Sequence, residues 1–159
     1  MPRDTERIGR SGEYLTCSVL ARESDTVTVM PHTSHADVIF EWEHKLYRCQ
    51  VKTVTHIESK YKNWRFDIRK GQSKSKKNRS YKKDQIDIIA MVNLEYQTVC
   101  FKAFSDCKTT QITIKDEIMK SINSVESLKE AMESIILATD GRQGKNESTS
   151  GTKKTAING

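Results

Sequence analysis

The sequence predicts an α/β (α+β) fold in which a central mixed β-sheet is flanked by helices. Short runs rich in β-branched and aromatic residues recur between residues 26 and 104, at the length of strands. A segment with helical spacing precedes these runs, and two more follow them. The chain has 159 residues, enough for one domain that buries roughly 70% of its unfolded surface. We therefore expect a single domain over residues 1–139 and a disordered tail over residues 140–159.

The first predicted helix covers residues 9–23, "GRSGEYLTCSVLARE", and is expected to start at Ser11 or Gly12. At 100° per residue, Glu13 shares a face of this helix with Cys17 and Leu20, which have the character of core residues. One carboxylate is therefore expected to be oriented toward the interior.

Strands are expected at residues 26–30, 36–42, 46–54, 64–68, 86–92 and 98–104, all in the central sheet. The tripeptide "EHK" between the second and third of these strands predicts a tight antiparallel hairpin. Two C-terminal helices are expected, one from about Lys115 and one from Val125 to Ala138 with Ser124 as its cap.

Cysteine usage and hydropathy exclude several classes of protein. The four cysteines are far apart, with no CxxC pair and no histidine at zinc-finger spacing, which favours buried thiols. No stretch approaches the roughly 20 apolar residues that cross a bilayer, and the start "MPRDTERIGR" is too polar for a signal peptide. We expect a soluble cytoplasmic protein that does not bind a membrane.

The basic charge of the chain is concentrated in one segment. Residues 69–83, "RKGQSKSKKNRSYKK", contain eight Lys or Arg residues and no acid. Removing these eight charges from the formal net charge of +6 leaves −2 for the remainder. Such a local patch attracts polyanions, of which nucleic acid is the commonest in a cell.

Four polar residues in segments that otherwise resemble core are candidates for chemistry. Strand alternation places Gln50 and Lys52 on one face, the hairpin brings Asp37 to the neighbouring strand, and the first helix supplies Glu13. Two carboxylates, an amide and an ammonium suit a hydrolytic site that uses magnesium. Each residue alone has an ordinary structural interpretation, so the inference depends on their order and spacing.

The order of these residues resembles the PD-(D/E)XK nuclease superfamily, in which a helix glutamate precedes a strand aspartate and a (D/E)-x-K or Q-x-K strand. The segments "GRSGEYLTCSVLARE", "HADVIFEWEHKLYRCQVKT" and "YKKDQIDIIAMV" are similar to those of intron-encoded homing endonucleases and archaeal Holliday-junction resolvases. The resemblance covers residues 8–104 and implies a restriction-endonuclease-like core.

The resemblance also implies roles for individual residues. Asp37 would be the main ligand of Mg²⁺ or Mn²⁺, together with the carbonyl of Val51, and Glu13 would approach the ion directly or through water. Lys52 would be the catalytic lysine. Gln50 stands where most relatives have an acid, so weaker metal binding or greater dependence on Glu13 and on the DNA phosphate is expected.

Two further positions bear on the comparison with the superfamily. Ala36 precedes Asp37 where the name of the motif has a proline, a position that varies among members. Asp87 matches a recurrent aspartate, which we expect to be structural or to support the site.

The implied function is a magnesium-dependent DNA endonuclease, most simply a homing-type, site-specific enzyme of a bacterial or phage-infected cell. Two alternatives stay open: a nuclease specific for branched DNA, like a Holliday-junction resolvase, and a DNA-binding module on a decayed nuclease fold. Cutting both strands of duplex DNA suggests a homodimer or a higher symmetric oligomer.

Contacts to double-stranded DNA are expected from the basic segment and the residues before it, with base contacts from Gln72, Asn78 and Arg79. The full expected set is Lys60, Lys62, Arg65, Arg69, Lys70, Gln72, Lys74, Lys76, Lys77, Asn78, Arg79, Lys82 and Lys83.

Overall fold

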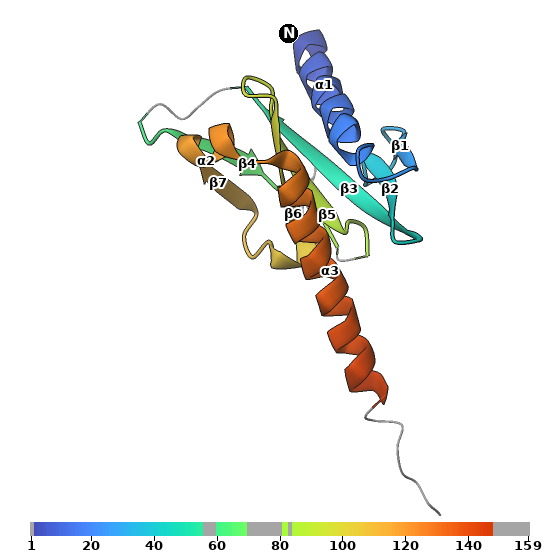
Figure 1. The fold of residues 1–159 in the computed structure, drawn as a ribbon. Coiled ribbons are helices and arrows are strands. Elements are labelled where there is room, and N and C mark those ends of the chain that lie inside the picture. Colours follow the sequence, from blue (N-terminus) through green and yellow to red (C-terminus); the bar gives the residue numbers. More distant parts are fainter. Residues whose placement is uncertain (1, 56–59, 70–80, 83, 148–159) are drawn as a thin grey trace, which may run out of the picture.

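The structure, a computed structural model, contains a five-stranded mixed sheet, a separate two-stranded sheet and three α-helices (Figure 1). It describes residues 2–55, 60–69, 81–82 and 84–147. The helices are α1 (Pro2–Leu20), α2 (Asp116–Ser121) and α3 (Ser124–Glu147). The strands are β1 (Val27–Val29), β2 (Val38–Trp42), β3 (Lys45–Val54), β4 (Asn63–Asp67), β5 (Ile88–Asn93), β6 (Thr98–Ala103) and β7 (Gln111–Lys115).

The large sheet has the strand order β1-β2-β3-β5-β6, and only the central β3–β5 pair is parallel. The return from β3 to β5 passes through residues 55–87, which include β4 and the basic segment. The predicted α+β architecture with a mixed central sheet is therefore confirmed. The long strand β3 lies at its centre, where it pairs with β2 through residues 45–49 and with β5 through residues 49–54.

Each face of the large sheet is covered by a different layer. Helices α1 and α3 lie over one face, α1 against β3 and α3 against β6, as Figure 1 shows. Their core contains Leu20 and Leu128, packed with Val51 and Phe101 of the sheet. The opposite face is covered by the β4–β7 sheet and α2.

The second core layer explains why β4 leaves the central sheet. Residues Trp64 and Phe66 of β4 are buried against Ile89 and Met91 of β5. The prediction that residues 64–68 join the central sheet is wrong, because β4 pairs antiparallel with β7 and packs on the sheet face. The segment "TTQITI" does not by itself predict a strand. In the structure its last residues belong to β7, which forms by pairing with β4.

The hairpin between β2 and β3 agrees with its prediction. Trp42 and Lys45 are paired across it, and the two residues between them, Glu43 and His44, have φ angles of 48° and 66°. Two successive left-handed residues define the turn whose twist matches a β-hairpin. The turn sets the β2–β3 register, which places Val38 opposite Cys49.

Helices α1 and α3 begin differently from their predictions. Helix α1 begins at Pro2 rather than near Ser11, because proline is tolerated in the first turn, where its missing N–H has no helical partner. The cap of α3 is Asn123, whose side-chain oxygen accepts the Glu126 N–H at 3.1 Å. The expected cap, Ser124, instead accepts the Val99 N–H at 2.9 Å.

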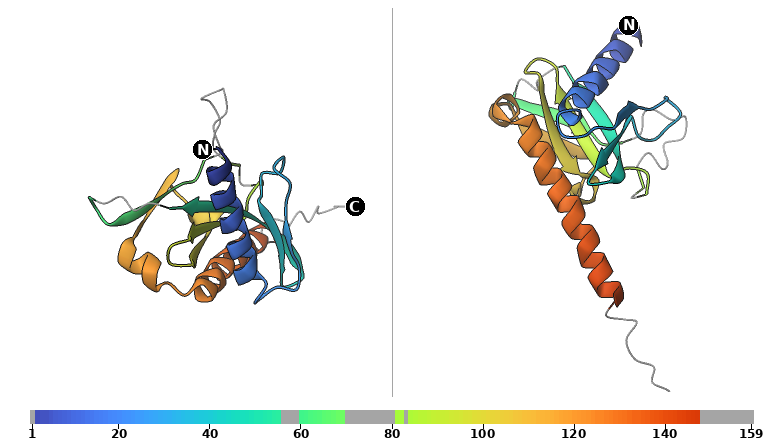
Figure 2. Two further views of the ribbon diagram at one scale, coloured as in Figure 1. Left: turned by 90° about the horizontal axis from the view of Figure 1, so that it is seen from above. Right: turned by 45° about the vertical axis from the view of Figure 1, so that its right-hand side comes forward.

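Helix α3 also continues past the expected domain end at residue 139. It runs to Glu147, since residues 140–147 contain no proline and extending an existing helix costs little. Its C-terminal part extends beyond the sheet (Figures 1 and 2). The rest of the expected tail, residues 148–159, lies outside the described residues. No helix in the described ranges is long and apolar enough to cross a membrane.

Helix α1 approaches β3 so closely that only glycine fits at the contact. A Cβ added to Gly12 would lie 1.8 Å from Thr53 Oγ1, 3.0 Å from its Cβ and 3.1 Å from its Cγ2. Rotating the threonine about its Cα–Cβ bond cannot relieve the contact fully, because the rotation leaves Thr53 Cβ itself 3.0 Å away. This contact sets the height of α1 over β3 and so the position of the next residue, Glu13.

We predict that Gly12→Ala lowers the free energy of unfolding by about 1–3 kcal/mol, since overpacking must push the helix off the strand. Urea unfolding measures the change. The matched control is Gly9→Ala on the same helix, where an added Cβ meets nothing within 4 Å. Helix propensity predicts that this control is neutral or stabilising by up to about 1 kcal/mol. Equal stability of the Gly12→Ala and unmodified proteins would contradict the close contact.

Candidate active site

The site is built around Asp37, which lies one residue before β2. The Asp37 N–H donates to the carbonyl of Cys49 at 2.9 Å, which continues the contact between the two strands. The Val51 N–H of β3 then donates to Asp37 Oδ2 at 2.8 Å. The carboxylate therefore takes the place of a backbone acceptor and is attached directly to the central strand.

Gln50 holds the same carboxylate oxygen. Its Nε2 donates to Asp37 Oδ2 at 2.6 Å, and the residue is only 7% exposed. In this position Gln50 orients the aspartate, and its amide would have to turn before its oxygen could reach a cation. An acid here would face Asp37 as a second buried anion, which burial makes costly.

Lys52 lies two residues further along β3, on the face shared with Gln50. Its ammonium donates to the carbonyl of Arg69 at 2.8 Å and to Tyr81 Oη at 3.5 Å. Its charge also lowers the pKa of Asp37. The Q-x-K spacing therefore brings the amide and the ammonium to the same carboxylate, as the alternation of the strand predicts.

Glu13 completes the cluster from the neighbouring helix. Burial raises the pKa of Glu13, and the charge of Asp37 raises it further, while His32 and Arg10 lower it. The two carboxylates are therefore close enough to repel each other. The structure brings together all four residues that the sequence indicated as catalytic.

The ionised carboxylate of Asp37 is electrostatically unfavourable at its position. Burial raises the pKa of Asp37, against the opposing effects of the Val51 hydrogen bond, Lys52, His32 and Gln50. Two partly buried carboxylates that repel each other destabilise the folded chain unless positive charge compensates them. A divalent cation between them would supply that compensation.

The donor set fits a hard cation such as Mg²⁺. Both hydrogen bonds to the Asp37 carboxylate go to Oδ2, and Oδ1 accepts none from the described residues. A strand residue directs its N–H and C=O to the same edge, so the Val51 carbonyl lies on the edge of β3 that faces Asp37. Glu13 would be the third oxygen ligand.

No three His, Cys, Asp or Glu side chains of the described residues form a metal-binding group. A site with two carboxylates and a carbonyl therefore leaves positions for water or phosphate oxygens, which is the usual situation of Mg²⁺.

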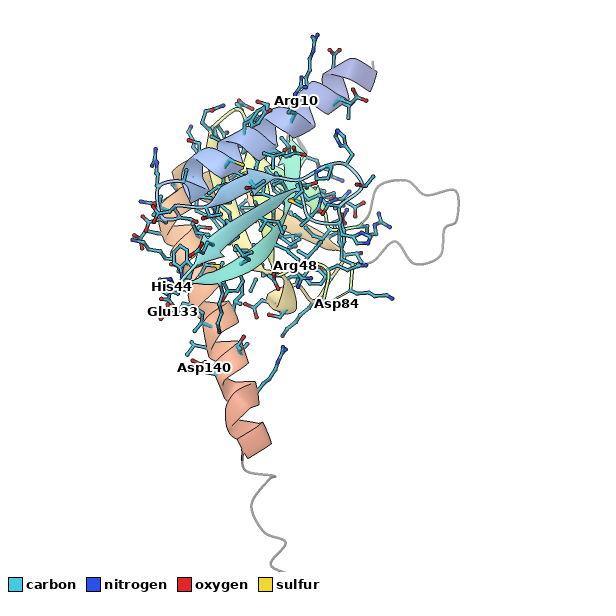
Figure 3. All side chains as sticks on the ribbon, turned by 90° about the vertical axis from the view of Figure 1, so that its right-hand side faces the viewer. Arg10, His44, Arg48, Asp84, Glu133 and Asp140 are labelled. Carbon is cyan, nitrogen blue, oxygen red and sulfur yellow. The ribbon has the colours of Figure 1, made fainter. Side chains whose placement is uncertain are left out.

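A groove of about 540 Å³ adjoins the cluster. It lies between α1 and the segment after β1, and Glu13 is part of its wall. The guanidinium groups of Arg7 and Arg10, the imidazole of His32 and the carboxylate of Glu6 line it, and the exposed ring of Tyr14 adds an apolar surface. Figure 3 shows Arg10 on α1.

Sequence reasoning missed two residues of the site. His32 influences both carboxylates and lies in the connection between β1 and β2, where only its position after Pro31 could have drawn attention to it. Tyr81 contacts Lys52 and is the one aromatic residue of the basic segment. That isolated aromatic was a usable signal.

The predicted DNA-binding residues divide into two sets. Lys60, Lys62, Arg65, Arg69 and Lys82 are described by the structure, and all but Arg69 have exposed side chains. The Arg69 guanidinium forms two hydrogen bonds to the Asp67 carboxylate, at 2.7 and 2.6 Å. The remaining predictions lie outside the described residues: Lys70, Gln72, Lys74, Lys76, Lys77, Asn78, Arg79 and Lys83.

Asp87 has the contacts of a structural residue. Its carboxylate accepts the Arg48 N–H at 2.8 Å and two guanidinium hydrogen bonds at 3.2 Å, and Arg48 is labelled in Figure 3. The Asp87 N–H donates to the Arg48 carbonyl at 2.9 Å. These bonds attach the start of β5 to β3 at Arg48, two residues before Gln50.

The fold and the cluster together define a mixed-sheet α+β chain with two carboxylates at the open end of the β2–β3 hairpin, opposite its turn. Among solved structures, the chain is similar to "The structure of a bacterial homing endonuclease: I-Ssp6803I", with a TM-score of 0.62 and 17% sequence identity. The similarity covers 87% of this chain and 97% of that one. At this identity it establishes a shared fold. No protein-family model matches the chain, and no curated protein matches it.

The raised pKa of Asp37 leads to a prediction for metal-free protein. Asp37→Asn should raise the melting temperature by about 2–4 °C at pH 8, because the amide removes a buried charge and its oxygen can still accept from Val51 and Gln50. A raised folded pKa means that the charge costs stability above that pKa. The advantage of the variant should therefore shrink as the pH falls through the folded pKa of Asp37 toward the ordinary aspartate pKa of 3.8.

Thermal unfolding in a chelator between pH 8 and pH 4 measures this difference. The exposed Asp25→Asn serves as the control and should show no such trend. A lower melting temperature for Asp37→Asn at every pH would show that the carboxylate stabilises the fold rather than straining it.

Proposed function

We propose that the protein is a magnesium-dependent DNA endonuclease of the homing type, which hydrolyses a phosphodiester bond at the Asp37 cluster. One observation carries this proposal. At the open end of the β2–β3 hairpin, opposite its turn, four groups converge: Asp37, Gln50, Lys52 and Glu13. The similarity in fold to a bacterial homing endonuclease supports it. The basic composition of residues 69–83, of which Arg69 and Tyr81 contact Lys52, supports DNA as the substrate.

Each residue would have a separate task in the reaction. Asp37, Glu13 and the carbonyl of Val51 would hold the ion, and Gln50 would keep the aspartate oriented. When bound, Mg²⁺ lowers the pKa of coordinated water and offsets phosphate charge. Lys52 would donate to the phosphate oxygen or the attacking water as negative charge develops.

The charges around the cluster suggest a path for the DNA. Arg69 and Tyr81, which begin and nearly end the basic segment, contact Lys52 on one side of Asp37. The groove with Arg10 and His32 lies on the Glu13 side. A strand whose phosphate reaches Asp37 would extend from the basic segment toward this groove. One such site serves one strand, so we propose a symmetric homodimer for cutting both strands.

Two other functions make different predictions. A resolvase would bind a four-way junction much more tightly than linear duplex. A decayed DNA-binding module would bind without magnesium and cleave no DNA. The grouping of Glu13, Asp37 and Lys52 argues against decay, since a fold that only binds DNA does not require two repelling carboxylates at one point.

Asp37→Ala should reduce cleavage by at least about 1,000-fold, because the main oxygen ligand is lost. Lys52→Ala should reduce it by about 100- to 1,000-fold, since one donor to the developing charge is removed. A magnesium-dependent assay on a random duplex library, followed by assays on the selected site, measures both losses. Binding in Ca²⁺ should change much less than cleavage.

Lys45→Ala is the matched control, because Lys45 lies on the same strand and is exposed at the hairpin. It should cleave at the unmodified rate. The site assignment is wrong if the Asp37 and Lys52 variants cleave like this control.

Gln50→Glu tests the role of the buried amide. In a chelator the variant should lose about 1–3 kcal/mol of stability, because a carboxylate replaces the amide N–H that now donates to Asp37. Excess magnesium should restore that stability, because the added charge strengthens an oxygen site. Thermal unfolding with and without magnesium gives both values.

The exposed substitution Gln111→Glu on β7 is the control for added charge, and its response to magnesium should match that of the unmodified protein. If magnesium stabilises Gln50→Glu no more than this control, the cluster does not bind the ion.

A further inference from the structure

Tyr81 is the residue of the cluster for which neither the motif nor the comparison assigns a task. Its hydroxyl oxygen accepts a hydrogen bond from Lys52 Nζ at 3.5 Å, and its ring centroid lies 5.5 Å from the same nitrogen. An ammonium has no acceptor, so the phenol must accept in this pair. Tyr81 therefore contacts Lys52 through its oxygen and through the adjoining part of its ring.

The ring of Tyr81 is itself fixed by the sheet. It meets Phe104 edge-on, with centroids 6.4 Å apart and an interplanar angle of 87°. The Phe104 N–H donates to the carbonyl of Asp87 at 2.9 Å, and the Asp87 carboxylate binds Arg48 on β3. The tyrosine is thus braced by residues that adjoin β5 and β6, and through Asp87 and Arg48 by β3, the strand that carries Lys52.

The chemical state of Tyr81 suits this contact. Burial raises its pKa to about 12, with contributions from the charges of Asp37 and Asp67. The phenol therefore stays neutral through the range in which enzymes of this kind work, and it can accept from an ammonium. The influence of Asp37 on Tyr81 also places the ring within the electrostatic reach of the cluster.

The second contact of Lys52 comes from the other side of the basic segment. Its ammonium donates to the backbone carbonyl of Arg69 at 2.8 Å. Arg69 and Tyr81 precede and follow residues 70–80 in the chain, and both meet the same nitrogen. The lysine is therefore held by both flanks of the segment with the highest positive charge.

We infer that Tyr81 is a positioning residue, which holds the Lys52 ammonium beside Asp37 and connects its placement to the segment that binds DNA. This inference rests on the proposed endonuclease function. A free lysine side chain carries about 2 kcal/mol of rotamer entropy. Fixing it before the substrate arrives removes that cost from the reaction step, so Tyr81 acts on the rate rather than on affinity.

Two substitutions separate the hydroxyl from the ring. Tyr81→Phe keeps the ring and removes the acceptor, and it should lower the rate at saturating DNA by about 3- to 10-fold, because a 3.5 Å hydrogen bond is long. Tyr81→Ala removes both contacts and should lower the rate by about 100-fold. The dissociation constant for DNA, measured in Ca²⁺, should stay within about twofold for both variants.

Tyr61 provides a matched control. It is also a tyrosine with a lysine over its ring, Lys60 at 5.3 Å, but it is 57% exposed. Tyr61→Phe and Tyr61→Ala should leave the saturated rate unchanged. If the Tyr81 variants cleave as fast as these controls, the inference is wrong. It is also wrong if the variants lose affinity as much as rate, because Tyr81 would then bind DNA directly.

A second readout needs no activity. The ring of Tyr81 should shift the NMR signals of the Lys52 ε-methylene protons through its ring current. These signals should stay shifted in Tyr81→Phe and move toward the position of an exposed lysine in Tyr81→Ala. Unchanged signals in Tyr81→Ala would overturn the contact itself. If the contact is present but the unmodified protein cleaves no DNA, the proposed endonuclease function is wrong. The contact between Tyr81 and Lys52 then has no catalytic role.

Discussion

The hydrogen bond from the Val51 N–H to Asp37 is the interaction on which the candidate site depends. Before the first β2 residue, Val38, the Asp37 carboxylate takes over as the acceptor for β3. Strand β3 pairs with β2 through residues 45–49 and with β5 through residues 49–54, so the carboxylate is attached to the strand that joins the two halves of the sheet. The side-chain alternation of the same strand then directs Gln50 and Lys52 toward it.

This arrangement gives the site its geometry at a cost in stability. Burial raises the pKa of both Glu13 and Asp37, and the charge of Asp37 raises the pKa of Glu13 further, so two like charges face each other inside the fold. The close approach of α1 at Gly12 leaves Glu13 little freedom to withdraw. Such strain is typical of a site that is completed by a cation or a substrate phosphate.

The fold and the chemistry support the functional conclusion at different levels. A TM-score of 0.62 at 17% identity shows that the backbone course is shared with a bacterial homing endonuclease, although few side chains are. The argument for nuclease chemistry therefore depends on the residues themselves. Gln50 is informative here, because it holds Asp37 where another carboxylate would repel it.

Local patterns in the sequence determined most of the elements and the core of the site. Period-two alternation, the hairpin turn and helical spacing are set by neighbouring residues, and they were sufficient to place Asp37, Gln50 and Lys52 together. Element limits were less well determined. The wrong cap for α3 and its wrong end at Ala138 arose because several residues in each place can cap or continue a helix.

Only the tertiary structure decided which segments meet from a distance. Strand β4 pairs with β7 across more than forty residues, and no local pattern of "WRFDI" distinguishes that partner from the central sheet. The same is true of His32, which reaches the cluster from the β1–β2 connection, and of Arg69 and Tyr81, which reach it from the β4–β5 connection. The sequence by itself determined which groups could perform the chemistry, because residue type and spacing along a strand are local. Packing decided which other groups hold them in place, because those contacts exist only after the sheet, the helix and the two layers have assembled.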